Sequence, residues 1–327
     1  MHPPEFWERR DLSARAVSAA LSPIAWLYGA SVAYRRDHTM GYRTKARIVC
    51  VGNVTAGGSG KTPVAIAVAL VLLARGRRVT FLTRGYGGRL AGPVVVNTKE
   101  HNARDVGDEP LLLARIAPTI VARDRKAGAR LADAQDGGVI IMDDGHQNFA
   151  LAKDLSIVVV DTESGFGNGR VLPAGPLREP VRQGLARADA VIMSGQGTLS
   201  LPGYSGPLLR ARIVPAMPAI GNCRALAFAG IGRPEKFFST LKSLGVHLVA
   251  CHAFADHHFY TRGEVSTLKA KAAEEHAILV TTEKDYVRLS GQDRVDILAL
   301  PVRAIFDLPE ELQRLLDRVA ERMAVPT

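Results

Sequence analysis

Short runs of apolar residues alternate along this chain with longer segments that favour helix. Six apolar runs have the length of a buried strand: residues 47–52, 78–83, 118–122, 139–142, 156–160 and 190–193. Three segments between them are expected to form helices: residues 61–75, 108–116 and 124–134. Continuous apolar strands separated by helices are typical of a parallel sheet that is covered on both faces. The pattern therefore predicts an α/β fold with a parallel main sheet.

Glycine and proline gather between residues 196 and 222, and the alternation restarts after them. Strands are expected at residues 225–229 and 277–281, with helices at 234–244 and 309–323. A cluster of turn-forming residues between two periodic regions is a common place for a domain boundary. We therefore expect a main domain over residues 41–218 and a second, smaller α/β domain over residues 219–327.

The first 40 residues follow a different pattern. No charged residue occurs from position 16 to position 34, and arginines flank this stretch on both sides. Serine, proline and glycine dilute it, whereas a stable membrane span needs ~20 mostly apolar residues. Aromatic residues such as Trp26 and Tyr34 suit the headgroup region, and the arginines suit anionic lipid. Residues 1–40 are thus predicted to be a membrane-associated helical segment; the alternative is a helix packed on the protein's own core.

Composition narrows the class of partner. The chain has 327 residues and a net charge of +10, which favours an anionic partner: nucleic acid, an anionic membrane or a phosphorylated ligand. Its three cysteines include no CxxC pair, as expected for core thiols in a reducing compartment. Scattered arginines without an RNA-binding aromatic motif or a zinc finger argue against nucleic acid.

A glycine-rich loop follows the first predicted strand and precedes the first long helix. Such a loop turns backbone N–H groups toward phosphate oxygens, and the helix start adds its positive dipole end. Lys61 would reach the β- and γ-phosphates, and the Thr62 hydroxyl would bind Mg²⁺. The consensus places glycine where this chain has Thr55. The predicted nucleotide-binding residues are Thr55, Ala56, Gly57, Gly58, Ser59, Gly60, Lys61 and Thr62. The fold is therefore expected to be P-loop NTPase-like, with ATP and Mg²⁺ as cofactors.

Two acids end the strand at residues 139–142. In P-loop folds an acid at such a strand end holds Mg²⁺ directly or through water. Asp143 or Asp144 fills this role, and the sequence does not distinguish them. His146 and Gln147 follow and line the same site if the strand ends there; alone, His146 is typical of a structural histidine.

A second acidic pair, Asp108 and Glu109, opens a predicted helix with Pro110 in its first turn. One interpretation is helix capping, since aspartate is a good N-cap. The other is a carboxylate aimed at the acceptor hydroxyl, which a kinase needs in order to orient its nucleophile. The pattern alone leaves both open.

The predicted small domain contains the run Asp256-His257-His258. Zinc sites usually show further ligands at readable spacing, and neither CxxC nor HExxH is present. A histidine that pairs with a carboxylate in the cleft is the preferred interpretation.

Seven short runs in consistent order resemble the tetraacyldisaccharide 4′-kinase family, the lipid A kinases of Gram-negative bacteria. They are GGSGKTP (57–63), RGYGG (84–88), GDEP (107–110), DDGHQ (143–147), LPAGPLREP (172–180), FADHHFY (254–260) and TEKD (282–285). Each run is weak alone, but seven in order are specific. The threonine at position 55 also fits this family.

The resemblance implies a reaction and a location. ATP would phosphorylate the 4′-hydroxyl of a tetraacylated glucosamine disaccharide 1-phosphate and give lipid IVA. The acyl chains of this substrate hold it in the bilayer, at ~0.8 kcal/mol per CH₂, so the enzyme must come to the membrane. The expected partners are this lipid and the cytoplasmic face of the inner membrane, with the enzyme as a monomer and without nucleic acid.

The resemblance also implies residue roles. Lys61 and the loop hold the triphosphate, while Thr62 with the pair Asp143–Asp144 positions Mg²⁺. Asp108 would be the catalytic base and His257 its partner. A protonated His257 would lower the pKa of Asp108, whereas a neutral one would relay the proton, and both stay open.

Arg123 and Arg178 are weaker candidates for phosphate contacts, with surface salt bridges as the equal alternative. One competing function is a P-loop ATPase or GTPase switch. The run Thr282-Glu283-Lys284-Asp285 has its lysine one place too late for a guanine-reading motif.

Overall fold

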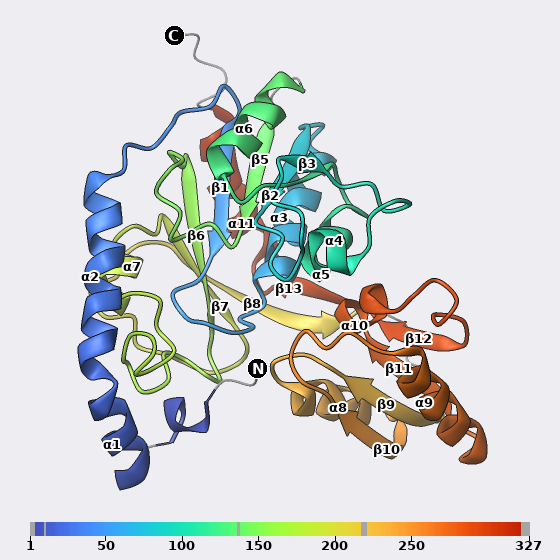
Figure 1. Ribbon diagram of the computed structural model, residues 1–327. Coiled ribbons are helices and arrows are strands. Elements are labelled where there is room, and N and C mark those ends of the chain that lie inside the picture. The colour runs from blue at the N-terminus through green and yellow to red at the C-terminus, as the bar shows by residue number, and fades with distance from the viewer. Residues whose placement is uncertain (1–3, 10, 136–137, 217–220, 322–327) are drawn as a thin grey trace.

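Two sheets organise the protein in the computed structural model, which describes residues 4–9, 11–135, 138–216 and 221–321 (Figure 1). The larger sheet has nine strands in the described part of the chain, in the order β13 (Val302–Phe306), β8 (Leu208–Pro215), β7 (Ala190–Ser194), β6 (Leu155–Asp161), β1 (Arg47–Gly52), β5 (Val139–Asp143), β2 (Val79–Thr83), β4 (Thr119–Val121) and β3 (Val94–Val95). The smaller sheet has the order β10 (His247–Ala253), β9 (Arg224–Ala229), β11 (Ile278–Thr282) and β12 (Ile297–Leu300).

Helices cover both faces of the larger sheet. They are the short η1 (Glu5–Trp7), α1 (Leu12–Ala20), α2 (Ser22–His38), α3 (Lys61–Ala74), α4 (Ala103–Val106), α5 (Asp108–Leu113), α6 (Arg125–Ala134), α7 (Val181–Leu185) and α11 (Pro309–Glu321). The smaller sheet carries α8 (Pro234–Ser243), α9 (Arg262–Glu274) and α10 (Glu283–Arg288). We call the larger sheet with its helices the large unit, and residues 221–300 the small unit.

The main core forms because the central strands are apolar on both faces. Every residue of β5 and β6 is buried, as expected for strands that are covered on both sides. On one face α3 and α11 pack against β1, β2 and β5 to β8. On the other face α6 contributes Ala129 and Ala132 to a second apolar cluster. The predicted α/β class with helices on both faces is confirmed.

The predicted parallel main sheet is confirmed for its inner strands, and two antiparallel strands extend it at the edges. Its seven inner strands are parallel within the described residues, but β3 and β13 at the two edges run antiparallel to their neighbours. Strand β8 also lies inside the stretch 196–222, where only a glycine- and proline-rich boundary was expected. Only Leu209 and Ala211 of β8 are buried, whereas every residue of β5, β6 and β7 is buried, so the apolar signal of β8 was weak.

The end of the chain returns to the large unit. Strand β13 pairs with β8, and Leu312, Leu315 and Leu316 of α11 enter the main core beside α3. The expected division at residue 219 placed all of residues 219–327 in the small domain, and for β13 and α11 this assignment is wrong. The physical reason is that their apolar faces complete the main core rather than that of the small unit. The predicted boundary at 218/219, and the end of the last helix at 323, lie outside the described residues.

The N-terminal helices lie along one side of the large unit (Figure 1). Ala25 and Val32 of α2 are buried, whereas Trp26 and Leu27 are 73% and 62% exposed. Within the described residues no single helix is long and apolar enough to span a membrane. Helices α1 and α2 pass that test only as a pair that is bent by 54° at their junction. One face of α2 therefore packs on the protein, and the other presents aromatic and aliphatic side chains outward.

Candidate functional site

The glycine-rich loop connects β1 to α3, as the sequence predicted. It starts after Gly52, and α3 begins at Lys61. Gly57 and Gly60 have φ values of 104° and 81°, which only glycine adopts without strain. The side chains of Ser59 and Thr62 are buried, while Gly57 and Gly58 are exposed with open space beside them. The loop is therefore an open backbone turn at the start of a helix, as a phosphate-binding loop requires.

The segment 172–180 braces this loop from outside. The Ala56 backbone N–H donates to the Pro176 carbonyl at 2.7 Å, and the Arg178 N–H donates to the Val54 carbonyl at 2.8 Å. Inside the loop, Asn53 Nδ2 donates to Ser59 Oγ at 3.0 Å. These bonds fix both the outer and the inner edge of the turn. Thr55, at the position of the consensus glycine, lies in the braced part of the loop, where it forms an isolated bridge with Leu177.

Asp143 ends β5 directly beside the loop. Thr62 Oγ1 donates to Asp143 Oδ2 at 3.2 Å. The other carboxylate oxygen, Oδ1, is buried and has no hydrogen-bond donor among the described residues. Burial, with Glu109 and Asp144 nearby, raises the pKa of Asp143 to about 7. A buried carboxylate oxygen without a donor is costly unless a cation or a proton satisfies it, so Asp143 and Thr62 fit a divalent cation.

Asp144 lies between two cations. Arg178 binds it through two parallel contacts, Nη1–Oδ1 at 2.8 Å and Nη2–Oδ2 at 3.0 Å, and Lys61 Nζ lies 3.8 Å from Oδ1. Burial opposes ionisation, but Lys61 and Arg178 outweigh it and hold the pKa of Asp144 below its usual range. Arg178 is thus part of the site through Asp144. Arg123, in contrast, is exposed and donates to the Gly88 carbonyl at 3.2 Å.

His146 and Gln147 support the loop from below. His146 is fully buried, with Nε2 facing the Gly184 carbonyl at 2.9 Å and Nδ1 facing Ser156 Oγ at 3.1 Å. Burial lowers its pKa to about 3. Gln147 Nε2 donates to the Asn53 carbonyl at 2.8 Å. The structural reading of His146 therefore agrees with its surroundings, and Gln147 fixes the backbone at the start of the loop.

Asp108 is the first residue of α5 and is placed there by a tight turn. The preceding Gly107 has a φ of 91°, and a Cβ on it would lie 2.5 Å from the Tyr86 carbonyl oxygen. The RGYGG run therefore lies against the GDEP run, and no larger residue fits at position 107. Asp108 Oδ1 accepts the Glu109 backbone N–H at 3.0 Å. Asp108 is thus the first helical residue and not the N-cap, which is Gly107, and its other oxygen faces the small unit.

His257 of the small unit meets Asp108. Its Nδ1 lies 3.3 Å from Asp108 Oδ2, and the ring also packs near Tyr86, with centroids 5.3 Å apart. The hydrogen bond with Asp108 raises the pKa of His257. For Asp108, burial opposes ionisation, but His257, Lys284 and Arg288 outweigh it and lower its pKa below the usual range. The structure brings together these two residues, which the sequence assigned to different domains.

Two cations of α10 belong to this cluster and were assigned no role from the sequence. Lys284 Nζ lies 2.7 Å from Glu109 Oε1, and Arg288 binds Asp108 Oδ2 through Nε at 3.0 Å and through Nη2. Lys284 belongs to the TEKD run, which contributed to the family resemblance, but the sequence analysis assigned this lysine no role. Arg288 lies one turn further along the same helix and has no motif of its own. The charge of Glu109 also acts on Lys61 and Asp143, so the two acidic clusters lie near each other.

The neighbouring histidine, His258, has a different partner from His257. His258 Nε2 lies 3.1 Å from Glu264 Oε1, and Glu264 also caps α9 through the Thr261 N–H. Within the described ranges, no group of three or more His, Cys, Asp or Glu side chains is placed to hold a metal ion. Mg²⁺ is usually held by one or two carboxylates together with substrate phosphates, so this finding leaves the loop region as the candidate metal site.

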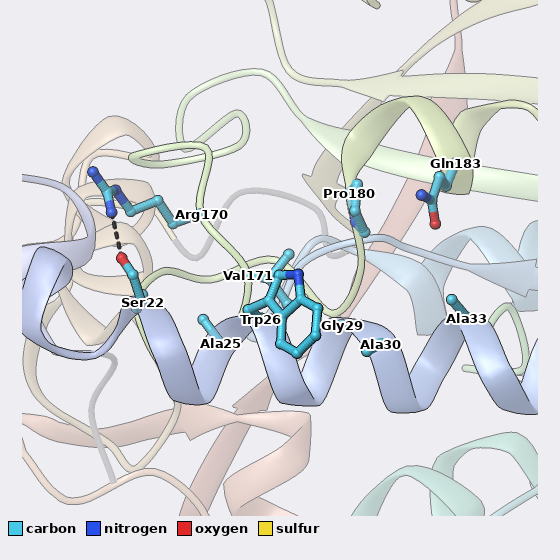
Figure 2. Close-up of a pocket in the computed structure, with 11 residues that line it drawn as sticks. Ser22, Ala25, Trp26, Gly29, Ala30, Ala33, Arg170, Val171, Pro180 and Gln183 are labelled. Carbon is cyan, nitrogen blue, oxygen red and sulfur yellow. Dashed lines mark hydrogen bonds between the residues drawn. The ribbon is translucent and has the colours of Figure 1, made fainter.

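A separate hollow lies between α2 and the segment 170–183 (Figure 2). It has a volume of about 380 Å³, and small side chains of α2, including Ala25, Ala30 and Ala33, line one wall. Arg170 Nη1 donates to Ser22 Oγ at 2.6 Å at one end. Trp26 lies at its rim in Figure 2. This hollow is on the N-terminal side of the large unit, where α2 faces the segment 170–183.

Comparisons with known proteins agree on one family. The family model described as LpxK, tetraacyldisaccharide-1-P 4′-kinase, matches residues 17–321. Tetraacyldisaccharide 4′-kinase of Paramagnetospirillum magneticum is 48% identical over 98% of this chain and 100% of that protein. Its counterpart from Rhodospirillum rubrum is 47% identical over 98% of each chain. The solved structure of the "apo" form of LpxK from Aquifex aeolicus in complex with ATP covers 93% of this chain and 99% of its own, with 26% identity and a TM-score of 0.73.

Proposed function

This chain belongs to the tetraacyldisaccharide 4′-kinase family, and we propose that it transfers the γ-phosphoryl group of ATP to the 4′-hydroxyl of a tetraacylated glucosamine disaccharide 1-phosphate. The product is lipid IVA, so the protein is a kinase of lipid A biosynthesis. The single observation that carries the proposal for this site is the meeting of Asp108 and His257 beside the loop that ends in Lys61 and Thr62.

ATP binding is supported by the ATP complex of the Aquifex aeolicus protein and by the open loop of this chain. The backbone N–H groups of residues 55–62 would cradle the triphosphate, with the α3 dipole behind them. Burial lowers the pKa of Lys61, while the neighbouring Asp144 opposes that shift. In the cation form, Lys61 would stabilise the negative charge that develops on the phosphates during transfer.

Mg²⁺ would be held by Thr62, Asp143 and Asp144. The support is the buried Asp143 Oδ1 that lacks a donor among the described residues and the Thr62 hydroxyl 3.2 Å from Oδ2. When bound, the ion supplies charge neutralisation for the phosphate oxygens. Asp143 is the better placed direct ligand, because Arg178 already occupies both oxygens of Asp144. Asp144 then sets the position of Lys61 and Arg178 around the phosphates.

Asp108 would orient the acceptor hydroxyl and take its proton. The acceptor oxygen forms a bond to the γ-phosphorus, the bond to the β,γ-bridging oxygen breaks, and ADP leaves with that electron pair. Because His257, Lys284 and Arg288 lower the pKa of Asp108, it is a weak base, and the proton moves late in the transfer. A proton on His257 Nδ1 is donated to Asp108, and this pairing explains the raised pKa of His257.

The membrane role of the N-terminal helices rests on their outward face. Trp26, Leu27 and Tyr34 are 73%, 62% and 64% exposed, and Arg35 and Arg36 follow them. An apolar face with a basic end fits the boundary between headgroups and acyl chains of an anionic membrane. We place the enzyme as a monomer at the cytoplasmic face of the inner membrane, where its lipid substrate lies.

Turnover without the lipid separates this function from that of a P-loop switch. A kinase with a positioned base hydrolyses ATP slowly until the acceptor is added, whereas a switch hydrolyses nucleotide without it. ADP formation by the full chain is therefore measured with and without the disaccharide 1-phosphate in mixed micelles. We expect stimulation of about tenfold or more by the lipid. Equal ADP formation in both reactions would favour the switch.

A further inference from the structure

We propose that Arg288 is a positioning residue of the phosphotransfer site: from the small unit, it holds the Asp108 carboxylate in one orientation. Arg288 ends α10 in the small unit, and Asp108 begins α5 in the large unit. The inference rests on the proposed function, because it assigns a task to Arg288 in the same reaction. It also makes assembly of the Asp108–His257 pair conditional on the two units lying together.

Both partners of this contact are buried. The side chains of Arg288 and Asp108 are 1% and 2% exposed. The guanidinium approaches Asp108 Oδ2 with two nitrogens, Nε at 3.0 Å and Nη2. Nη2 also lies 3.5 Å from His257 Nδ1. A planar guanidinium that contacts one oxygen with two donors leaves the carboxylate little freedom to rotate.

The small unit holds the other edge of the guanidinium. Arg288 Nη1 donates to Asp285 Oδ1 at 2.9 Å and to the Gly230 carbonyl at 2.6 Å. Asp285 is itself fixed by Tyr260 Oη at 2.8 Å, by the Gly230 N–H at 2.9 Å and by Thr282 Oγ1 at 2.6 Å. All of these partners belong to the small unit. Arg288 is therefore preorganised before it meets Asp108, as a rigid support for a reacting group must be.

The contact with Arg288 gives the two Asp108 carboxylate oxygens different partners. Oδ2 receives Arg288 and His257, whereas Oδ1 accepts one bond, from the Glu109 backbone N–H at 3.0 Å, in the part of the chain that the structure describes. A carboxylate oxygen can accept two hydrogen bonds. Oδ1 is thus the oxygen left to accept the hydroxyl of the acceptor sugar, and Arg288 determines which of the two oxygens that is.

Arg288 also balances the charges around Asp108. The charged and titratable groups around Asp108 come from three elements. They are Lys284 and Arg288 of α10, Glu109 of α5, and His257 and Asp256 of the loop after β10, with Asp285 behind Arg288. Burial alone would favour a protonated Asp108, and the cations keep it ionised. Without the guanidinium the pKa of Asp108 rises, so the enzyme loses its ionised base at a higher pH than the unaltered protein does.

The pH profile distinguishes positioning from a purely structural role. A residue that only joins the two units would alter the free energy of unfolding and the KM for ATP, but it would leave the acid limb of the kcat profile where it is. Arg288→Gln removes the charge and puts an uncharged amide in place of the guanidinium. Arg288→Lys keeps the charge but cannot contact Asp108 and Asp285 at the same time. Arg294→Lys is the matched control, because Arg294 lies in the same unit and donates only to the carbonyls of Tyr286 and Val287 among the described residues.

The experiment measures lipid phosphorylation by the full chain from pH 9 down to the lowest pH at which thermal unfolding shows that each variant is still folded. For Arg288→Gln we expect kcat to fall about tenfold or more, a smaller change in KM for ATP, and an acid limb that shifts to higher pH. Arg288→Lys should restore the acid limb but only part of kcat, and Arg294→Lys should match the unaltered protein. If Arg288→Gln does not fold, the test compares the kcat of Arg288→Lys with that of Arg294→Lys. The proposal predicts a lower kcat for Arg288→Lys, and equal values would overturn it.

The proposal is overturned if folded Arg288→Gln and Arg288→Lys keep the kcat and acid limb of the unaltered protein. It is also overturned if kcat falls only in proportion to the unfolded fraction. If the unaltered protein phosphorylates no lipid, the proposed function fails instead. The Arg288 inference is then decided by NMR titration of His257. Loss of the nearby cation should raise the His257 pKa in Arg288→Gln, and an unchanged value would refute the inference.

Discussion

His257 Nδ1 lies 3.3 Å from Asp108 Oδ2, and the two residues belong to different units of the protein. Asp108 opens α5 against the main sheet, and His257 follows the last residue of β10 in the small sheet by a short loop. Each residue alone has an ordinary explanation, as an acid in the first turn of a helix and as a surface histidine. Their contact joins the two units, and it is where we propose that the acceptor hydroxyl binds.

Lys61→Ala should abolish phosphate transfer while the fold survives. The Lys61 ammonium lies 3.8 Å from Asp144, and Arg178 continues to pair with that acid in the variant. Removing a cation that stabilises the transferring phosphoryl group should lower kcat by about a hundredfold or more. The assay is lipid phosphorylation at saturating ATP, with circular dichroism to confirm folding. Transfer within about twofold of the unaltered protein would remove Lys61 from the mechanism.

Asp143→Asn should stabilise the nucleotide-free protein and inactivate it. At neutral pH the buried Asp143 carboxylate has one oxygen without a donor among the described residues, and an amide keeps the acceptor for Thr62. Functional groups of this kind commonly reduce stability, so we expect the free energy of unfolding to rise by about 1 kcal/mol. Urea unfolding without Mg²⁺ measures the gain.

Asp143→Asn should also lose Mg²⁺-dependent ATP binding, which isothermal titration calorimetry measures. Asp144→Asn serves as the comparison, because it releases Arg178 from a two-point ion pair and should destabilise the protein. An Asp143→Asn variant that is both less stable and fully active would refute the assignment of Asp143 as the metal-side acid.

His257→Gln should lower the free energy of unfolding by an amount that depends on pH. Asp108 raises the pKa of His257 in the folded state, so the folded protein holds that proton more tightly than the unfolded chain does. This stabilisation is fully present below the ordinary histidine pKa of about 6.5 and is lost as the pH rises through the raised value. The difference in unfolding free energy between the two proteins should be about 1 kcal/mol at pH 6 and smaller at pH 9. Denaturant titrations at both pH values test this; equal differences would rule out a charged pair.

Trp26→Ser combined with Leu27→Ser should weaken membrane binding. Both side chains are more than half exposed on the outward face of α2, so the change removes apolar surface without opening the core. We expect co-sedimentation with anionic liposomes to fall severalfold, while ATP binding stays unchanged. Val295→Ser, at a 60% exposed position of the small unit, is the control. Unchanged sedimentation of the double variant would favour the alternative in which α2 only packs on the protein.

Local runs of residues predicted the positions of the glycine-rich loop and of the acids at the strand end well. The loop up to Thr62 and the acids after β5 lie where strand–loop–helix order placed them, because each feature is encoded by neighbours in the sequence. Longer-range features were missed. Strand β8 lies in a glycine- and proline-rich stretch, and β13 returns from the small unit to pair with it. No local pattern marks such pairing.

The acceptor side shows the same limit. The Asp108–His257 contact was expected only through resemblance to a family, since no spacing rule joins two residues of different sheets. Arg288 carried no signal, because a buried arginine acquires its meaning from the acids that the fold brings around it. Asp108 and Asp285 supply those acids from two units. Burial of charge by tertiary packing is therefore the part of the site that sequence patterns could not supply.

Transfer of radiolabel from [γ-³²P]ATP to the disaccharide 1-phosphate tests the central claim most directly. The full chain and Asp108→Ala are compared in mixed micelles, and the lipid is separated and checked for phosphate at the 4′ position. The account predicts label on the 4′-hydroxyl with the unaltered chain and almost none with folded Asp108→Ala. Label that stays in inorganic phosphate whether or not the lipid is present, or transfer by Asp108→Ala at the unaltered rate, would contradict it.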